Sequence, residues 1–307
     1  MENYKKKLIM DLVWLRSKVN FDFIYDQETF SNDDVIRYYK KTKYLLYRLV
    51  GSKNGEMHID ISDDGIYKKG VKYQEYHEER LNEILTNNPE IKNVLELGCG
   101  QGANMAYLAK RNPNVRFQGI DLYPSLDKRN RKYDISLIQG DYHDLSMIED
   151  NSIDMVYALE TLCYSQNKNQ IFKEVNRVLK PNGLFIIYDA YLNKKRSELS
   201  EIEQIGAKLV ESGYYLNEFE YIGNIDRYIK DNNFEIVKVE DMKKKVINHL
   251  KQYQYRIQKY FKFGPLFTIF CKLIPKEVLG NIVPVYFMAD TIEMDLSVYV
   301  NHVLRKK

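Results

Sequence analysis

The chain has few cysteines, and those it has form no pattern. Its 307 residues include only Cys99, Cys163 and Cys271, an odd number without a Cys-x-x-Cys pair. Disulfide-stabilised secreted domains use dense, even sets of cysteines, and structural zinc sites use closely spaced pairs. The sequence therefore predicts a protein of the reducing, cytoplasmic compartment, with no disulfide framework and no metal site.

The sequence also lacks an excess of either charge and a long apolar run. It has 46 lysines and arginines against 43 aspartates and glutamates, a formal net charge of +3. A nucleic-acid-binding face needs a clustered basic excess, so no nucleic-acid partner is expected. Asp11 and Arg16 interrupt the apolar N-terminal segment and no cleavage site follows, so we expect no signal peptide. Charged residues and Pro275 break the C-terminal apolar stretches, so we expect no membrane span.

What the sequence does contain is a regular alternation of apolar segments and helices, with 44% hydrophobic residues overall. Segments of strand length lie at residues 94–97, 115–121, 135–139, 153–158 and 184–188. Helices expected at 103–110 and 170–179 alternate with them, which predicts a parallel, doubly wound sheet. Further strands are expected at 234–239 and 297–304. The predicted fold class is therefore α/β, with a seven-stranded, mostly parallel sheet.

Both ends of the chain depart from this series. Apolar residues recur at three-to-four spacing within residues 1–50, which predicts helices, and another helix is expected from about 73 to 85. We expect residues 1–86 to form a helical N-terminal cap. Residues 87–307 would form the core, with an aromatic-rich lid insertion at about 243–295. The aromatic residues of that insertion are Tyr253, Tyr255, Tyr260, Phe261, Phe263, Phe267, Phe270, Tyr286 and Phe287.

A glycine-rich loop, ELGCGQG at residues 96–102, follows the first strand. A chain that turns directly from a strand into a helix needs residues that tolerate positive φ, and a ligand lying on its backbone leaves no room for a Cβ atom. Gly98, Gly100 and Gly102 meet both needs. The positive end of the next helix suits a carboxylate, and Glu96 suits an ammonium group. The loop thus predicts a site for the zwitterionic end of an amino acid.

Two later carboxylates bear on which ligand the loop binds. The glycines alone also fit a relaxed dinucleotide pattern, which leaves NAD or FAD as an alternative. Asp121 ends the second strand, where it could bind a ribose diol in either case. Asp141 follows the third strand, where it could meet an adenine amino group, while Glu96 would repel a pyrophosphate. Together these features favour a ligand with both an adenosine and an amino-acid moiety.

With these motifs, residues 94–188 resemble the core of the class I S-adenosylmethionine-dependent methyltransferases. The matching segments are residues 94–102, 119–121, 140–141, 149–154 and 179–184. The resemblance implies a Rossmann-like fold with S-adenosyl-L-methionine as cofactor, and helical lid elements at both ends of the chain. The expected cofactor-binding residues are Tyr76, Glu96, Gly98, Gly100, Gly102, Asp121, Leu122, Asp141, Tyr142 and Leu159.

The segment after the fourth strand faces the reacting methyl group in this fold. Residues 157–165, YALETLCYS, resemble the sterol side-chain and related terpenoid C-methyltransferases, which carry a glutamate in a similar place. Those enzymes have a histidine where this chain has Tyr164. The resemblance implies that Glu160 stabilises a cation that develops on an alkene carbon, as carboxylates and aromatic faces can do. Alternatively, Glu160 is an acid at a helix N-terminus or a contact to the cofactor helix.

Oxygen acceptors would instead need a general base, for which His77 and His143 are the candidates. Tyr73 and Tyr76 are expected near the cofactor or the lid. Nothing in the sequence beside Cys163 would lower its pKa, so it is not expected to be a nucleophile. The expected catalytic residues are Glu160, Tyr164 and His77.

The sequence therefore favours a methyltransferase acting on a lipophilic small molecule, with C-methylation of an isoprenoid-like acceptor preferred. O- or N-methylation of a small natural-product metabolite, RNA or protein methylation, and cofactor binding without catalysis remain alternatives. The aromatic residues of 253–287 fit a lid over an apolar acceptor. Their interleaved lysines also fit a peripheral membrane contact, and the region would equally suit a homodimer face.

Overall fold

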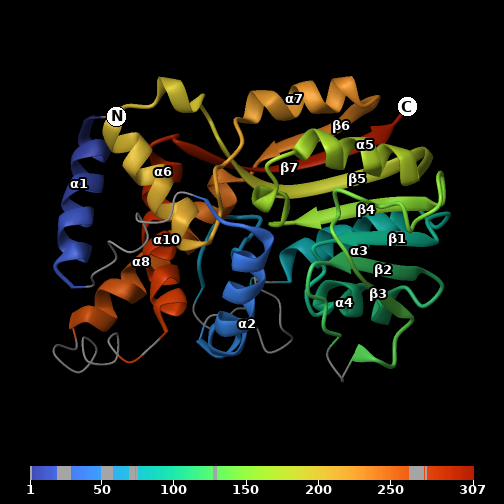
Figure 1. Ribbon diagram of the computed structural model, residues 1–307, viewed down its shortest axis with the longest axis horizontal. Helices are drawn as coiled ribbons and strands as arrows, with labels where there is room; N and C mark the ends of the chain where they lie inside the picture. Colours follow the sequence, from blue (N-terminus) through green and yellow to red (C-terminus); the bar gives the residue numbers. More distant parts are fainter. Residues whose placement is uncertain are drawn as a thin grey trace.

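A computed structural model describes residues 2–18, 29–49, 58–68, 73, 75–126, 130–262, 273 and 275–307. Its centre is a seven-stranded sheet of order β3-β2-β1-β4-β5-β7-β6 (Figure 1). The strands are β1 (Asn93–Leu97), β2 (Arg116–Asp121), β3 (Ile135–Gln139), β4 (Ile153–Leu159), β5 (Leu179–Leu192), β6 (Phe234–Asp241) and β7 (Ser297–Lys306). Strands β1 to β5 are parallel, and β7 is antiparallel to both β5 and β6. The predicted α/β fold class is confirmed.

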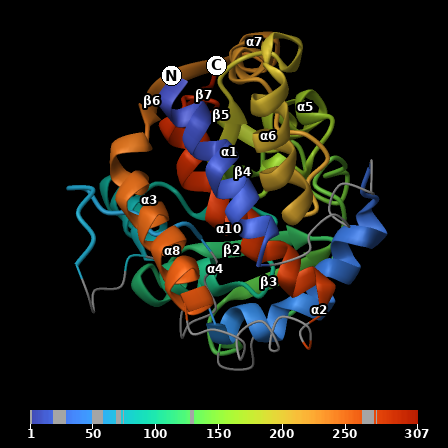
Figure 2. The ribbon, with the colours of Figure 1, turned by 90° about the vertical axis from the view of Figure 1, so that its left-hand side faces the viewer.

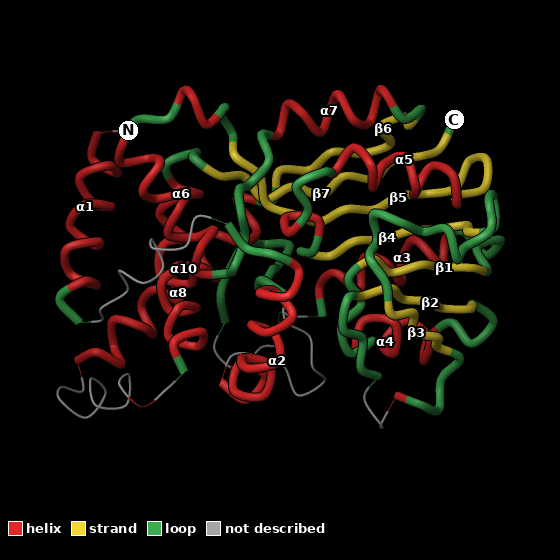
Figure 3. Tube along the Cα trace, viewed as in Figure 1, coloured by secondary structure: helices red, strands yellow, loops and turns green. Residues whose placement is uncertain are grey.

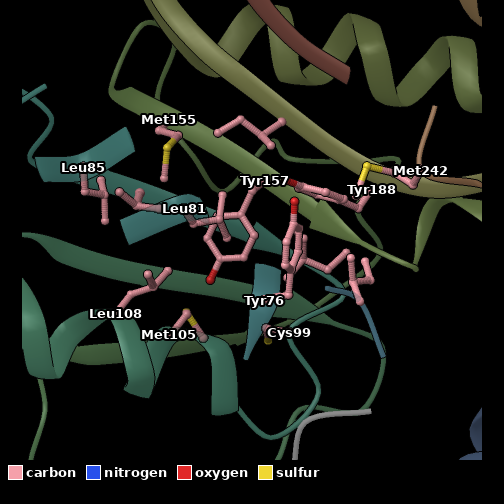
Figure 4. Packing of buried hydrophobic residues seen from close by; sticks show 14 of the residues in the cluster. Tyr76, Leu81, Leu85, Cys99, Met105, Leu108, Met155, Tyr157, Tyr188 and Met242 are labelled. Carbon is pink, nitrogen blue, oxygen red and sulfur yellow. The ribbon is translucent and has the colours of Figure 1, made fainter. Parts of the chain in front are cut away.

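Strand β4 illustrates how the sheet is buried on both faces. Met155 and Tyr157 belong to one core cluster, while the alternate residues Val156 and Ala158 belong to a second. A parallel strand between two helical layers is expected to be apolar throughout. In Figure 4, Tyr157 lies within the first cluster, among residues of two covering helices. The first face is covered by α3 (Tyr76–Asn87) and α4 (Ala103–Arg111), and the second by α5 (Lys168–Val178) and α7 (Ile222–Asp231).

Five further helices gather at the carboxyl ends of the parallel strands (Figures 1 and 2). We call them the helical cover: α1 (Glu2–Arg16), α2 (Asn32–Leu49), α6 (Glu201–Gly213), α8 (Lys243–Lys262) and α10 (Lys276–Glu293). Helix α10 packs against each of the other four. Its packing against α6 requires a glycine at position 213, because a Cβ atom there would lie 2.3 Å from the Pro284 ring. Segments from both ends of the chain thus form one layer beside the sheet (Figure 3).

The boundaries differ most from the sequence prediction near residue 180. Helix α5 ends at Val178, and β5 begins at Leu179, which pairs with Ile153. The predicted start of this strand was residue 184. The register shifts before Met155, and Asn182 has a φ of 65°. An irregularity of this kind lets a turn-like sequence remain part of a strand.

None of the described helices is both long and apolar enough to cross a membrane. Part of the predicted lid insertion, including Phe263, Phe267 and Phe270, lies outside the described residues.

Candidate active site

A cavity of about 790 Å³ lies between the carboxyl ends of the strands and the helical cover. One end, which we call the loop end, is lined by the segments that follow β1, β2, β3 and β4. The other end, the cover end, is lined by residues of α2, α6, α8 and α10. The two ends form one continuous space, so a ligand at the glycine loop and a ligand under the cover would meet within it.

The glycine loop takes the conformation that its sequence predicts. Gly98, Gly100 and Gly102 have φ values of 71°, 51° and 69°, which favour glycine. A Cβ atom at Gly98 would lie 2.0 Å from the hydroxyl oxygen of Thr161, whereas one at Gly100 would meet nothing within 4 Å. Gly98 and Gly100 line the cavity; Gly102 instead precedes the first turn of α4.

Asp121 at the end of β2 fixes the loop and lines the cavity beside Leu122. One carboxylate oxygen accepts a hydrogen bond from the backbone N–H of Gly100 at 3.0 Å. The other accepts from the N–H of Tyr123 at 2.8 Å. A carboxylate oxygen has further lone pairs, so Asp121 can still accept hydrogen bonds from a ligand.

Asp141 lies beside the cavity without lining it. Its carboxylate accepts hydrogen bonds from the backbone N–H of His143 (2.9 Å) and from the Asn32 amide (3.3 Å), and it also bonds the His143 ring. Burial opposes ionisation, but the bonds from His143 outweigh it and lower the pKa of Asp141. The other ring nitrogen of His143 bonds Ser165 at 2.6 Å. His143 therefore orients Asp141, whereas the next residue, Tyr142, does line the cavity.

Glu96 is buried beneath the loop and does not line the cavity. It accepts hydrogen bonds from the Asn104 amide at 2.5 Å and from the Tyr157 hydroxyl at 3.1 Å. Burial raises the pKa of Glu96 to about 8. Its contact with a ligand ammonium group stays a prediction. Asn104, which lines the cavity in front of Glu96 and also bonds His58, was not anticipated, although it lies in the first turn of the helix after the loop.

Glu160 follows β4 in a strained conformation with φ 50°. One carboxyl oxygen accepts hydrogen bonds from the Ile59 backbone N–H at 3.0 Å and from the Tyr299 hydroxyl at 2.7 Å. Glu160 lines the cavity beside Leu159, and burial raises its pKa to about 7. Its charge also acts on Tyr214, a lining residue just after α6, so this carboxyl group lies between the segment after β4 and the helical cover. Tyr299, on the last strand, carries no sequence signal that would have identified it.

Tyr164 lines the cavity as part of a group of tyrosines. The Tyr39 hydroxyl of α2 donates to the Tyr164 hydroxyl at 2.9 Å, and Tyr164 in turn donates to the backbone carbonyl of Tyr214 at 3.2 Å. From α8, Tyr253 and Tyr260 also line the cavity. The result is a largely aromatic wall at the cover end.

Tyr76 and His77 do not line the cavity. The Tyr76 ring packs in the core cluster of Figure 4, and its hydroxyl bonds Asp63 and Lys245. His77 is fully buried and bonds the Tyr299 hydroxyl at 2.8 Å. Tyr73, whose ring contacts His249, is also absent from the lining. His77 therefore meets the cavity lining from behind: Nε2 bonds Tyr299 and lies 3.9 Å from a Glu160 oxygen, and the ring packs against His58.

The aromatic residues of 253–287 divide between several environments. Tyr253 and Tyr260 line the cavity, whereas Tyr286 and Phe287 are buried within the helical cover. Tyr255 is exposed. A lid over the acceptor, a dimer face and a membrane contact would therefore each use different residues of this region. Within the described part of the chain, no group of three His, Cys, Asp or Glu side chains could hold a metal ion.

The central segment of the chain is similar to a family of known proteins. The model of the family described as "Methyltransferase domain" matches residues 95–187. The chain is 25% identical over 158 residues to the sterol 24-C-methyltransferase of Saccharomyces cerevisiae, which covers 48% of this chain and 40% of that protein. The chain thus matches less than half the length of this relative.

Solved structures share the fold over nearly the whole chain. A putative sarcosine dimethylglycine methyltransferase from Galdieria sulphuraria superposes with a TM-score of 0.66 at 17% identity, over 88% of this chain and 98% of that one. The geranyl diphosphate C-methyltransferase of Streptomyces coelicolor A3(2) superposes with a TM-score of 0.60 at 14% identity, over 90% and 97%. At these identities the likeness establishes the fold alone.

Proposed function

We propose that this chain, a class I S-adenosylmethionine-dependent methyltransferase, transfers a methyl group to a carbon atom of a lipophilic, isoprenoid-like small molecule. The observation that carries the proposal is the position of Glu160. Its carboxyl group lines the cavity in the segment after β4, and its charge also acts on Tyr214, a lining residue on the side of the helical cover. The relation to sterol and geranyl diphosphate C-methyltransferases supports the same acceptor class.

The loop end fits S-adenosylmethionine as the methyl donor. The space beside Gly100 would be filled by a Cβ atom and is open for a ligand to lie against the backbone. Asp121 can accept hydrogen bonds from a ribose, with Leu122 and Tyr142 beside it. Asn104 offers a polar group at the amino-acid end. When bound here, S-adenosylmethionine supplies a methyl group attached to a positively charged sulfur. After the transfer, the sulfur remains in the neutral thioether that is the leaving group.

The cover end fits an apolar acceptor. Its lining combines tyrosine rings with aliphatic side chains such as Ile257, Ile282 and Met288. A cavity of this kind excludes water and holds an acceptor close to the donor, and that positioning is the main requirement of an in-line methyl transfer.

Glu160 can serve the acceptor in two successive ways. When an alkene carbon forms a bond to the methyl carbon, the neighbouring carbon becomes a carbocation, which the carboxylate and the surrounding rings stabilise. The carboxylate then takes a proton from an adjacent carbon, and the electrons of that C–H bond restore a neutral alkene. Because the pKa of Glu160 is about 7, its basic form is available at neutral pH.

N-methylation is a second candidate, because a carboxylate among aromatic rings also suits an amine that becomes a cation. The likeness to a putative sarcosine dimethylglycine methyltransferase supports it. Identification of the methylated atom in the product distinguishes the two candidates.

The test begins with calorimetry of S-adenosylmethionine binding and continues with a labelled-methyl screen of neutral-lipid and polar extracts. We expect micromolar binding and label on carbon in the neutral-lipid fraction. No binding would refute the donor assignment. Label confined to the polar or RNA fraction would refute the lipophilic acceptor.

A further inference from the structure

Glu160 is the first of three hydrogen-bonded groups that lead from the cavity into the core. The Tyr299 hydroxyl of β7 lies 2.7 Å from a Glu160 oxygen, and the His77 ring nitrogen Nε2 of α3 lies 2.8 Å from that hydroxyl. Tyr299 and His77 are both buried. Three segments far apart in the sequence thus meet in one chain of bonds.

The number of hydrogens fixes the direction of these bonds. A tyrosine hydroxyl has a single hydrogen, and an ionised carboxyl group can only accept. When Glu160 is ionised, Tyr299 must donate to it, so Nε2 of His77 must carry a hydrogen and donate to the Tyr299 oxygen. Burial lowers the pKa of His77 well below its usual value, and His58 adds to this effect. His77 is therefore neutral, and a neutral ring with its hydrogen on Nε2 has none on Nδ1.

The environment of Nδ1 agrees with this direction. Nδ1 of His77 is buried and has no hydrogen-bond partner among the described residues. Leaving an N–H group buried without an acceptor would cost more than leaving a bare lone pair, because a donor in the core is nearly always paired. The geometry favours the tautomer in which both hydrogens of the chain point toward Glu160.

We propose that His77 is a positioning residue that acts through Tyr299. By donating to the Tyr299 oxygen it directs the hydroxyl hydrogen at Glu160, and this favours the ionised form of the carboxyl group that faces the acceptor. The role of that carboxyl group rests on the proposed function, whereas the chain of bonds does not. His77 itself does not line the cavity, and its Nε2 lies 3.9 Å from the Glu160 oxygen, beyond hydrogen-bond distance.

Other groups also act on Glu160, and their effects have to be separated from this one. The Ile59 backbone N–H favours the ionised carboxyl group, while Asp60 and burial disfavour it. The groups that face Glu160 or its two partners include His58, Ile59, Asp60, Tyr76, Cys163, Tyr188, Asp189 and Tyr214. All of them remain in the variants below, so a change in the pKa of Glu160 reports on the chain of bonds.

The test is an infrared pH titration of the protonated carboxyl band in the protein without ligands, with Glu160→Gln used to assign the band. We expect Tyr299→Phe to raise the pKa of Glu160 by about one unit, a tenfold change in its dissociation constant. His77→Phe should raise it by less, and His77→Gln, which retains an N–H donor, should restore it. As a control, His302→Gln changes a different buried histidine, which lies on β7, and should leave the pKa of Glu160 unchanged.

An unchanged pKa in His77→Phe would refute the proposal, and so would equal shifts in His77→Phe and His77→Gln, because His77 would then act by packing alone. If a variant fails to fold, ¹⁵N NMR of the wild-type ring gives the answer independently. The hydrogen should be on Nε2, and finding it on Nδ1 would also refute the proposal. These experiments need no methyl donor or acceptor, so failure of the proposed function would not affect them.

Discussion

The two ends of the cavity are built in different ways. The loop end consists of strand ends and backbone, namely the glycine loop after β1, Asp121 at the end of β2, Tyr142 after β3 and Glu160 after β4. The cover end consists of side chains from α2, α6, α8 and α10, which come from both termini and the middle of the chain. A parallel sheet brings its strand ends together by topology, whereas helices of a cover meet only through their own packing. One end is thus set by the fold and the other by particular side chains.

The largest effect is expected at the loop end, from Gly98→Ala. Its Cβ atom would overlap Thr161 at a positive φ, so we expect a loss of about 2 to 4 kcal/mol of unfolding free energy together with donor binding. Urea unfolding and calorimetry measure both quantities.

Gly100→Ala is the matched comparison, because its Cβ atom meets only open space. Because Gly100 also has a positive φ, this variant should lose about 1 kcal/mol of unfolding free energy, less than Gly98→Ala, and bind the donor at least tenfold more weakly. If both variants were equally stable, the closeness of Gly98 to Thr161 would not be a constraint on the fold.

Glu160→Gln should have the next largest effect, about a hundredfold or more on kcat with donor affinity unchanged. In the wild type, activity should rise with pH through about 7 as the basic form appears. The variant should lack this rise. Glu149→Gln, at an exposed glutamate, is the control. Full activity of Glu160→Gln would remove Glu160 from the chemistry.

Glu160 should also lower the free energy of unfolding at alkaline pH, where its buried carboxyl group is ionised. Its folded-state pKa is raised from 4.5 to about 7, so the folded protein holds this proton more tightly than the unfolded chain. The resulting stabilisation is complete below the ordinary carboxyl pKa and is lost as the pH rises toward 7. Glu160→Gln should therefore match the wild type at pH 4 and exceed it at pH 8 by up to about 3 kcal/mol. An equal difference at both pH values would point to packing instead.

The same contrast explains what the sequence could predict. The apolar segments and the glycine loop predict the sheet and place Gly98, Gly100 and Asp121 at the cavity, because these features depend on local chemistry and topology. Tyr299 and Asn104 could not be found, since only the packing of distant segments brings them to Glu160 and Glu96. Tyr76 and His77 are adjacent in sequence and face the core rather than the cavity, which a count of helical periodicity does not reveal.

A smaller effect is expected at the cover end, from Tyr260→Ala. Tyr260 lines the cavity from α8, so its loss should raise the acceptor KM about five- to tenfold without changing donor affinity. Tyr255, on the same helix and similarly exposed, does not line the cavity. Tyr255→Ala should leave KM unchanged. An equal increase of the acceptor KM in both variants would favour a dimer or membrane contact through this surface over a lid.

The smallest effect should come from His143, which orients a carboxylate of the loop end. In His143→Ala, Asp141 keeps the backbone hydrogen bond but loses the ring, so we expect donor affinity to fall about three- to fivefold. The pKa of Asp141 should rise, so on acidification the variant should lose donor affinity at a higher pH than the wild type. Ser165→Ala removes only the other partner of the ring and should have less effect. Calorimetry from pH 4 to 7 measures the donor affinity of both variants. Identical pH dependence in His143→Ala and the wild type would mean that the His143 backbone N–H and Asn32 hold Asp141 without the ring, so that no side chain of this segment adds to what the fold sets at the loop end.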